Sequence, residues 1–277
     1  MHITILYLAV AFIYASVAAD FWRMSNTNGT PQNQNLHAVM IAFGLILHGW
    51  LLFDNIFITA SPLVGGFNFG FYNALSAIFW LTVLTYWLSD LNHELHSLQA
   101  FVLPPAAIFT LLPAFTSQNH YIAVSNNAGG ALFLVHIGIA ILAYSLFTFA
   151  ALHALLMKIA ERSLHNKTTF IKLPSFPPLM VMETLLFRII GLGFILLTIT
   201  LISGVIFTEQ LFAKPLQYNH KTIFSIASWF IYAGLLFGRY QHGWRGLKAI
   251  RWTLVGFALL LLAYVGSKFV LEVLLHR

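Results

Sequence analysis

From Leu95 to Met157 the chain contains no Asp, Glu, Lys or Arg. A helix that crosses a bilayer needs about 20 mostly apolar residues, because the hydrocarbon core is about 30 Å thick and a helix rises about 1.5 Å per residue. The uncharged stretch is too long for one such helix, and two polar patches, residues 117–120 and 125–127, divide it. The sequence therefore predicts a chain that crosses a membrane several times.

The composition of the whole chain agrees with a lipid environment. Hydrophobic residues make up 59% of the 277 residues and charged residues 8%, whereas soluble globular domains carry about 25% charged residues. A soluble fold of this size could not bury so much apolar surface. We therefore expect an all-α, polytopic transmembrane bundle that forms one integral membrane domain over residues 1–277. The lack of Cys excludes disulfides, thiolate metal sites and thiol redox chemistry.

Eight segments are long and apolar enough to span the bilayer. They are residues 3–19, 37–57, 69–88, 98–114, 131–157, 185–207, 222–238 and 252–273. Basic residues predict their orientation, because cytoplasmic loops carry an excess of Lys and Arg. One set of loops contains Arg23, Lys158, Arg162, Lys167, Lys172, Arg239, Arg245, Lys248 and Arg251, and the opposite set contains Lys214, Lys221 and Arg277. The first set is then cytoplasmic, both termini are outside, and the net charge of +6 does not indicate a nucleic-acid partner.

Histidine is the residue type best suited to chemistry here, since imidazole binds haem iron and divalent metals. His37 and His48 are eleven residues apart, close to three helical turns, so they share one face of the second span. His48 falls near the middle of the membrane. A polar side chain at that depth is costly without a partner, which makes His48 a functional candidate. A hydrogen bond between helices is the structural alternative.

Three further histidines are predicted to lie at the outer membrane face. His136 is a few residues into the fifth span, His220 begins the seventh, and His276 follows the eighth. Imidazoles from three helices at one level can form a bis-His haem site or a metal site. In this hypothesis His136 and His220 bind the haem iron, with His276 or His48 as other choices of second ligand. The alternative is that these are unrelated interfacial residues.

The sixth span adds charged and small residues. Glu183 and Arg188 flank its start, where charges can lock a helix against its neighbours. Gly191, Gly193, Ser203 and Gly204 suit close helix packing. No phosphate-binding loop, nucleophile elbow, zinc-protease motif or carboxylate pair suited to hydrolysis occurs in the sequence.

The same span carries a resemblance to a known family. Residues 182–188 (MetGluThrLeuLeuPheArg), the Gly-Phe-Ile-Leu-Leu-Thr segment 193–198 and the Ser-Gly pair 203–204 resemble the integral membrane cytochrome c assembly proteins, of the CcsA and HemX type. The fifth span, from His136 to Tyr144, is similar to the family's His-containing helix. His-Lys-Thr at 220–222 and Gly-Trp-Arg-Gly at 243–246 resemble the bacterial inner-membrane YpjD-type subgroup. The resemblance covers about the C-terminal half and implies a multi-pass protein of the bacterial inner membrane that handles haem.

The sequence departs from that family in one segment. Haem-handling members have an outer Trp-rich segment, but the corresponding loop here, residues 209–221, contains no Trp. The resemblance also places Asn68 and Phe237 where the synthetase branch has His within its spans. The outer His of the fifth span is kept as His136, and His276 is the counterpart of the second outer His, offset by about one residue. The fold is therefore expected to transfer, whereas haem lyase activity is not.

Three functions are consistent with these residues. The first is a haem-binding or haem-handling protein with an accessory role in cytochrome c assembly or haem supply. The second is a transporter, or a transporter accessory subunit, for protons or a divalent cation, based on His48, His37 and nearby Asp54. The third is a haem lyase, against which the missing Trp-rich segment argues. The expected partners are the bilayer, haem, and membrane proteins of cytochrome assembly or metal transport.

Overall fold

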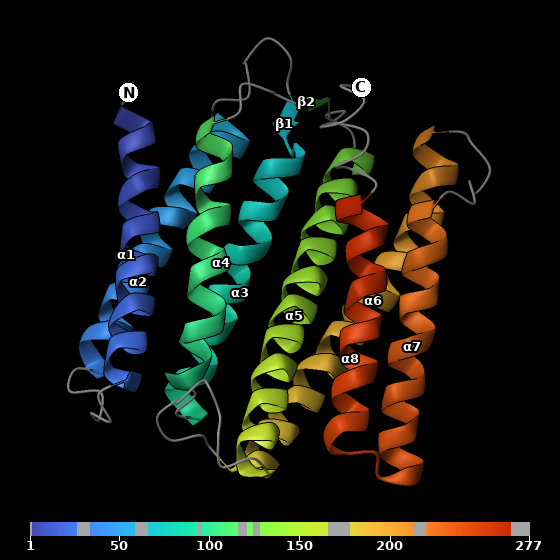
Figure 1. Ribbon diagram of the computed structural model, residues 1–277. Helices are drawn as coiled ribbons and strands as arrows, with labels where there is room; N and C mark the ends of the chain where they lie inside the picture. The colour runs from blue at the N-terminus through green and yellow to red at the C-terminus, as the bar shows by residue number, and fades with distance from the viewer. Residues whose placement is uncertain are drawn as a thin grey trace. The chain divides into compact units, whose positions relative to one another are not determined.

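A computed structural model of the chain describes residues 2–26, 34–58, 66–93, 96–115, 121–123, 128–165, 178–212 and 220–266. The chain divides into two compact units. Unit 1 comprises residues 1–123 and 155–182, and unit 2 comprises residues 124–154 and 183–277. Figure 1 shows that, within each unit, long helices run alongside one another. The expectation of a single domain over residues 1–277 stays a prediction.

Within the described residues, eight helices are long and apolar enough to cross a membrane. They confirm the all-α transmembrane class and the number of spans, while the N-out/C-out orientation stays a prediction. The eighth helix begins six residues before the predicted span, at Gly246 instead of 252, and continues to Leu261. The prediction placed this start too late, because the first turns of the helix include Lys248 and Arg251, charged residues that the apolar pattern assigned to a loop. Residues 267–273 of that predicted span lie outside the described residues.

Unit 1 is a four-helix bundle. Its helices are α1 (His2–Asn26), α2 (Gln34–Phe53), α3 (Phe71–His93) and α4 (Gln99–Leu111). Helices α1 and α3 each pack against both α2 and α4. Trp80 and Trp87, seven residues apart on α3, donate their indole N–H groups to the Leu45 and Ala38 carbonyls of α2, at 2.8 and 3.0 Å. These bonds fix the register of α3 against α2.

Short helical turns and two short strands lie at the ends of the helices of unit 1. They are the π-helical turn Asp54–Ile58, the 3-10 turns His96–Leu98 and Leu112–Phe115, and the strands β1 (Gly66–Asn68) and β2 (Tyr121–Ala123). The two strands pair antiparallel, with Gly66 opposite Ala123 and Asn68 opposite Tyr121. Asn55, in the π-helical turn, donates to the Tyr7 hydroxyl and to Asn73 Oδ1, each at 3.2 Å. Polar side chains thus join α1, the π-helical turn and α3 at this end of the bundle.

Unit 2 takes its spans from α5 (Ala128–His165), α6 (Leu179–Phe212), α7 (His220–His242) and α8 (Gly246–Leu261), which ends in the π-helical turn Leu262–Gly266. The last residues of α5 and the first four of α6 belong to unit 1.

Helices α7 and α8 form a hairpin in unit 2. Ser228 on α7 donates to the Gly256 carbonyl of α8 at 2.8 Å, and the Tyr232 hydroxyl donates to the Thr253 carbonyl at 3.3 Å. The Phe147 ring of α5 stacks on Tyr232, with ring centroids 4.0 Å apart. This aromatic pair ties α5 to the hairpin.

Candidate functional site

His136 lies in the third turn of α5, where the Ser-Gly pair of α6 faces it. The Nδ1 atom of His136 is 2.7 Å from Ser203 Oγ, and a Cβ added at Gly204 would lie 3.6 Å from the imidazole, at ordinary van der Waals distance. His136 is half-buried. The Ser-Gly pair of α6 thus lies directly beside the imidazole of α5.

The hydrogen bonds of Ser203 determine the tautomer of His136. Ser203 Oγ lies 2.7 Å from the Ile199 carbonyl and 3.2 Å from the Thr200 carbonyl of its own helix, so its proton is donated to the backbone. The same oxygen must then accept the Nδ1–H of His136. In this arrangement His136 Nδ1 carries a proton, and Nε2 is the ring nitrogen on the side away from Ser203. Histidines that bind metal commonly have this arrangement, with the second ring nitrogen fixed by an outer hydrogen bond.

The surroundings of His136 are apolar and aromatic. The Phe133 ring is nearly parallel to the imidazole, at 16°, with centroids 6.4 Å apart. Leu132 and Val135 on α5 and Ile202 on α6 are each more than half exposed. An apolar ligand could lie against this surface without displacing a packed core.

Of the three histidines predicted at the outer face, the structure describes His136 and His220. The starts of α5 and α7 and the end of α8 lie at the same end of unit 2 (Figure 1), so His136 and His220 belong to that end. His220 is the first residue of α7 and is exposed. None of the contacts of the described residues joins His220 to His136. His276 lies outside the described residues.

His48 is the centre of a different cluster, inside unit 1. Its Nε2 atom lies 2.9 Å from Ser76 Oγ of α3, and its Nδ1 atom lies 3.3 Å from Thr110 Oγ1 of α4. Thr110 donates its proton to the Ala106 carbonyl at 2.7 Å, so it accepts from His48 Nδ1–H, and Ser76 donates to Nε2. The Tyr14 ring of α1 lies 6.0 Å from the imidazole. All four helices of unit 1 thus meet at a fully buried histidine whose two nitrogens are both engaged.

His37 has a separate partner. Its Nε2 atom lies 2.9 Å from Asp20 Oδ2 on α1, so this hydrogen bond joins α1 to α2. His37 and His48 therefore have different partners, although they lie on one helix. Over the part of the chain that the structure describes, no group of three His, Asp or Glu side chains is arranged to hold a metal ion.

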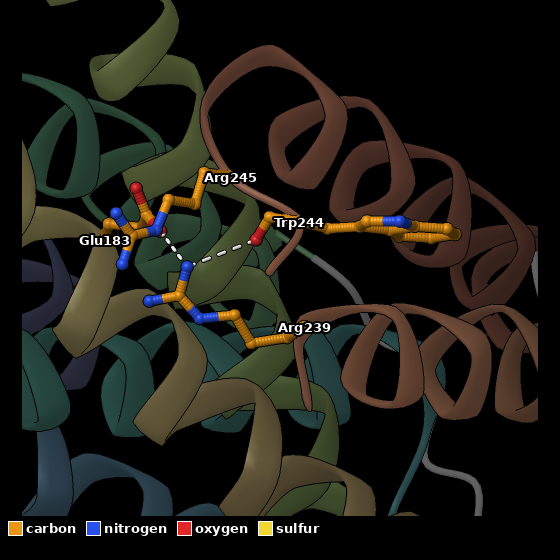
Figure 2. A network of polar contacts seen from close by, with 4 residues as sticks. All are labelled: Glu183, Arg239, Trp244 and Arg245. Carbon is orange, nitrogen blue, oxygen red and sulfur yellow. Dashed lines mark hydrogen bonds and ion pairs between the residues drawn. The ribbon is translucent and has the colours of Figure 1, made fainter. Parts of the chain in front are cut away.

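A charged network lies where α7 meets α8, and Figure 2 shows its four residues. Arg239 of α7 donates to Glu183 of α6 and, at 3.2 Å, to the Trp244 carbonyl in the turn. The Arg245 Nε atom lies 3.6 Å from the same carboxylate. Arg239 and Arg245 thus lock Glu183 against the hairpin, in agreement with the structural role that the sequence predicts for this charge.

Sequence reasoning missed the hydroxyl groups that orient the two histidines. Ser203 was expected to serve close helix packing, and Ser76 and Thr110 belong to no recognisable sequence motif. Their sequence separations from the histidines, 67, 28 and 62 residues, leave no local pattern to detect. A Ser or Thr on a span that otherwise lacks polar residues is the one general signal, since such hydroxyls bond across helices.

Comparisons with known proteins identify similar chains. A family model described as cytochrome C assembly protein matches residues 36–275. The inner membrane protein YpjD of Escherichia coli K12 is 35% identical over 175 residues, which cover 63% of this chain and 63% of that protein. A 28.8 kDa protein of Azospirillum brasilense is 29% identical over 209 residues, which cover 74% and 77% of the two chains.

A third relative is similar over a shorter region. The cytochrome c biogenesis protein CcsA of Gloeobacter violaceus is 31% identical over 91 residues, which cover 33% of this chain and 27% of that protein. No solved structure matches the chain. The matched region spans just under two thirds of the E. coli protein, at 63% of its length.

Proposed function

Because this chain belongs to the cytochrome c assembly protein family, we propose that it is a haem-handling protein with an accessory role in cytochrome c assembly or haem supply. It is a multi-pass inner-membrane protein, like its E. coli relative. Relatives named cytochrome c biogenesis proteins support a role in cytochrome c biogenesis. The local geometry of His136 supports haem as the ligand.

The observation that carries this proposal is the bond between His136 Nδ1 and Ser203 Oγ. It orients the ring through Nδ1, and Nε2 is the nitrogen that a haem iron would take. The exposed apolar side chains of Leu132, Val135 and Ile202 suit the apolar macrocycle of haem. Haem, when bound, would supply an iron centre, and Ser203 acts as the positioning residue for its ligand.

We assign the second ligand to the same end of unit 2. His220 begins α7 at that end, and Lys221 beside it provides a positive charge for a haem propionate. His276 remains a proposal on the sequence alone. We do not assign His48 to iron, because Ser76 and Thr110 engage both of its ring nitrogens.

No observation favours the transporter alternative. The arrangement of His48 is that of a buried residue satisfied by hydroxyl groups from two neighbouring helices. His37 pairs with Asp20 and not with His48. A path for a hard cation normally also needs oxygen ligands such as carboxylates.

The test is the visible absorption spectrum of the full chain, purified in detergent and titrated with hemin. We expect a Soret band that is lost in His136→Ala and broadened or shifted in Ser203→Ala, which keeps the ligand but frees its orientation. His220→Ala should weaken hemin binding, whereas His242→Ala should not, because His242 is the last residue of the same helix.

Two results would overturn the proposal. One is a wild-type protein that shows no Soret band after hemin is added. The other is a band that survives in His136→Ala with unchanged position and affinity. Equal elution volumes of wild type and variants in gel filtration show that each variant is folded.

A further inference from the structure

A basic surface lies at the α7–α8 turn, at the opposite end of unit 2 from the start of α5. We define this basic surface as Arg245, Lys248 and Arg251, which are all exposed. They are three residues apart, so they occupy successive turns along one side of α8. Arg245 is 64% exposed at its side chain even though its Nε atom approaches Glu183.

Two of the three cations are held in place. The Lys248 Nζ atom lies 3.7 Å above the ring of Trp244, and Glu183 restrains Arg245 at 3.6 Å. Trp244 is itself fixed, because its indole ring covers Gly238 and lies 5.0 Å from the Trp252 ring. Binding of a ligand to these cations therefore costs less side-chain conformational entropy than binding to mobile surface lysines would.

The charge of this end of unit 2 is unbalanced. Arg239 already engages Glu183, which is the only acidic residue within the described residues 183–208 and 220–266. This stretch thus supplies four cations, Arg239, Arg245, Lys248 and Arg251, but one carboxylate, which only Arg239 and Arg245 approach. The first turn of α8 contains no acidic residue, and Arg245 at its N-cap makes no capping bond with its side chain. The positive end of the helix dipole adds to the field.

Aromatic residues place this surface at the level of lipid headgroups. Tyr240 is 85% exposed near the end of α7, and Trp244 and Trp252 are half-buried beside the cations. Tyr and Trp concentrate where the hydrocarbon meets the headgroups. Cations at that depth lie beside lipid phosphates, and basic residues at the cytoplasmic face of a span attract anionic lipids.

We propose that the basic surface binds the headgroup of an anionic phospholipid. The lipid phosphate lies between Lys248 and Arg251, within reach of Arg245, and the acyl chains run along the apolar side of α8. This site is independent of haem binding and lies at the other end of unit 2 from His136.

The test is native mass spectrometry of the detergent-purified full chain with added phosphatidylglycerol or phosphatidylcholine. Wild type should retain phosphatidylglycerol and not phosphatidylcholine. The double variant Lys248→Gln/Arg251→Gln should bind phosphatidylglycerol about 30-fold more weakly, since each basic residue near an anionic surface contributes strongly. Arg245 is left unchanged because it also contacts Glu183.

The matched control is Lys158→Gln/Arg162→Gln, which removes one Lys and one Arg from the last turns of α5. It should bind phosphatidylglycerol within about twofold of wild type. An equal loss in both double variants would mean unspecific charge attraction and would overturn the proposal. So would equal retention of the two lipids, or displacement of the lipid by inorganic phosphate at equal concentration.

Discussion

Arg239→Gln should destabilise unit 2 more than any other substitution of a basic side chain in the α7–α8 hairpin. Arg239 makes three contacts at once: an ion pair with Glu183, a hydrogen bond to the Trp244 carbonyl and a cation–π contact with Phe187, 4.6 Å from the ring centroid. A hydrogen bond to a charged group contributes about 1.5–3 kcal/mol. A partly exposed cation–π contact adds about 0.5–1 kcal/mol.

The expected loss of stability is smaller than the sum of these contributions, because one contact of Glu183 remains in the variant. Arg245 still lies 3.6 Å from the carboxylate and keeps Glu183, whose side chain is 13% exposed, from being an unpaired buried charge. The full penalty of about 3–5 kcal/mol for breaking a buried pair therefore does not apply. We expect a loss of about 2–3 kcal/mol in the free energy of unfolding.

Equilibrium unfolding in mixed micelles of dodecylmaltoside and SDS, followed by tryptophan fluorescence, measures this loss. Glu183→Gln should cost about 1 kcal/mol, because the uncharged Gln side-chain oxygen can still accept a hydrogen bond from the Arg239 guanidinium. The double variant should lose less than the sum of the two single variants. Arg188→Gln, an exposed arginine on α6, is the control and should change stability by less than about 0.5 kcal/mol.

A change below about 0.5 kcal/mol in Arg239→Gln would refute this account of the network, and so would strict additivity of the two single variants.

Two further predictions concern the packing of each unit. Gly256→Ala should destabilise unit 2 by about 1–2 kcal/mol, because its Cβ would lie 2.8 Å from the buried Tyr232 ring, whereas Gly191→Ala, which faces open space, should be neutral or stabilising in the same unfolding assay. Equal effects of the two glycine variants would contradict the close approach of α7 and α8. Ser76→Ala should cost about 1–3 kcal/mol by leaving His48 Nε2 buried without a donor. Ser16→Ala should cost little, since Ser16 bonds to the Ile13 carbonyl of its own helix, and a harmless Ser76→Ala would argue against the buried cluster.

The spans could be predicted from sequence because lipid selects for long apolar runs, a property of each segment alone. The start of α8 could not, since two left-handed glycines, Gly243 with φ 61° and Gly246 with φ 54°, allow the chain to reverse within three residues. The helix then begins among charged residues that a hydropathy pattern excludes. The two strands of unit 1, three residues each, are also too short to leave a periodic signal.

The candidate site was predictable in its residues and not in its partners. His136 and the Ser-Gly pair at 203–204 each stood out in the sequence, but their contact depends on how α5 and α6 are rotated about their axes. The same holds for Glu183, whose partner Arg239 is 56 residues away. Hydropathy says which segments enter the bilayer, whereas pairing across helices depends on packing that acts only after insertion.

The short connection between α7 and α8 also restricts how the protein is made. Only residues 243–245 separate the two helices, and the amides of Gly243 and Trp244 bond back to the carbonyls of Arg239 and Gly238. Neither helix can therefore change its direction across the bilayer while the other stays in place. The pair must enter the membrane as one helical hairpin, so redistributing charge at this turn would have to invert both helices together or neither.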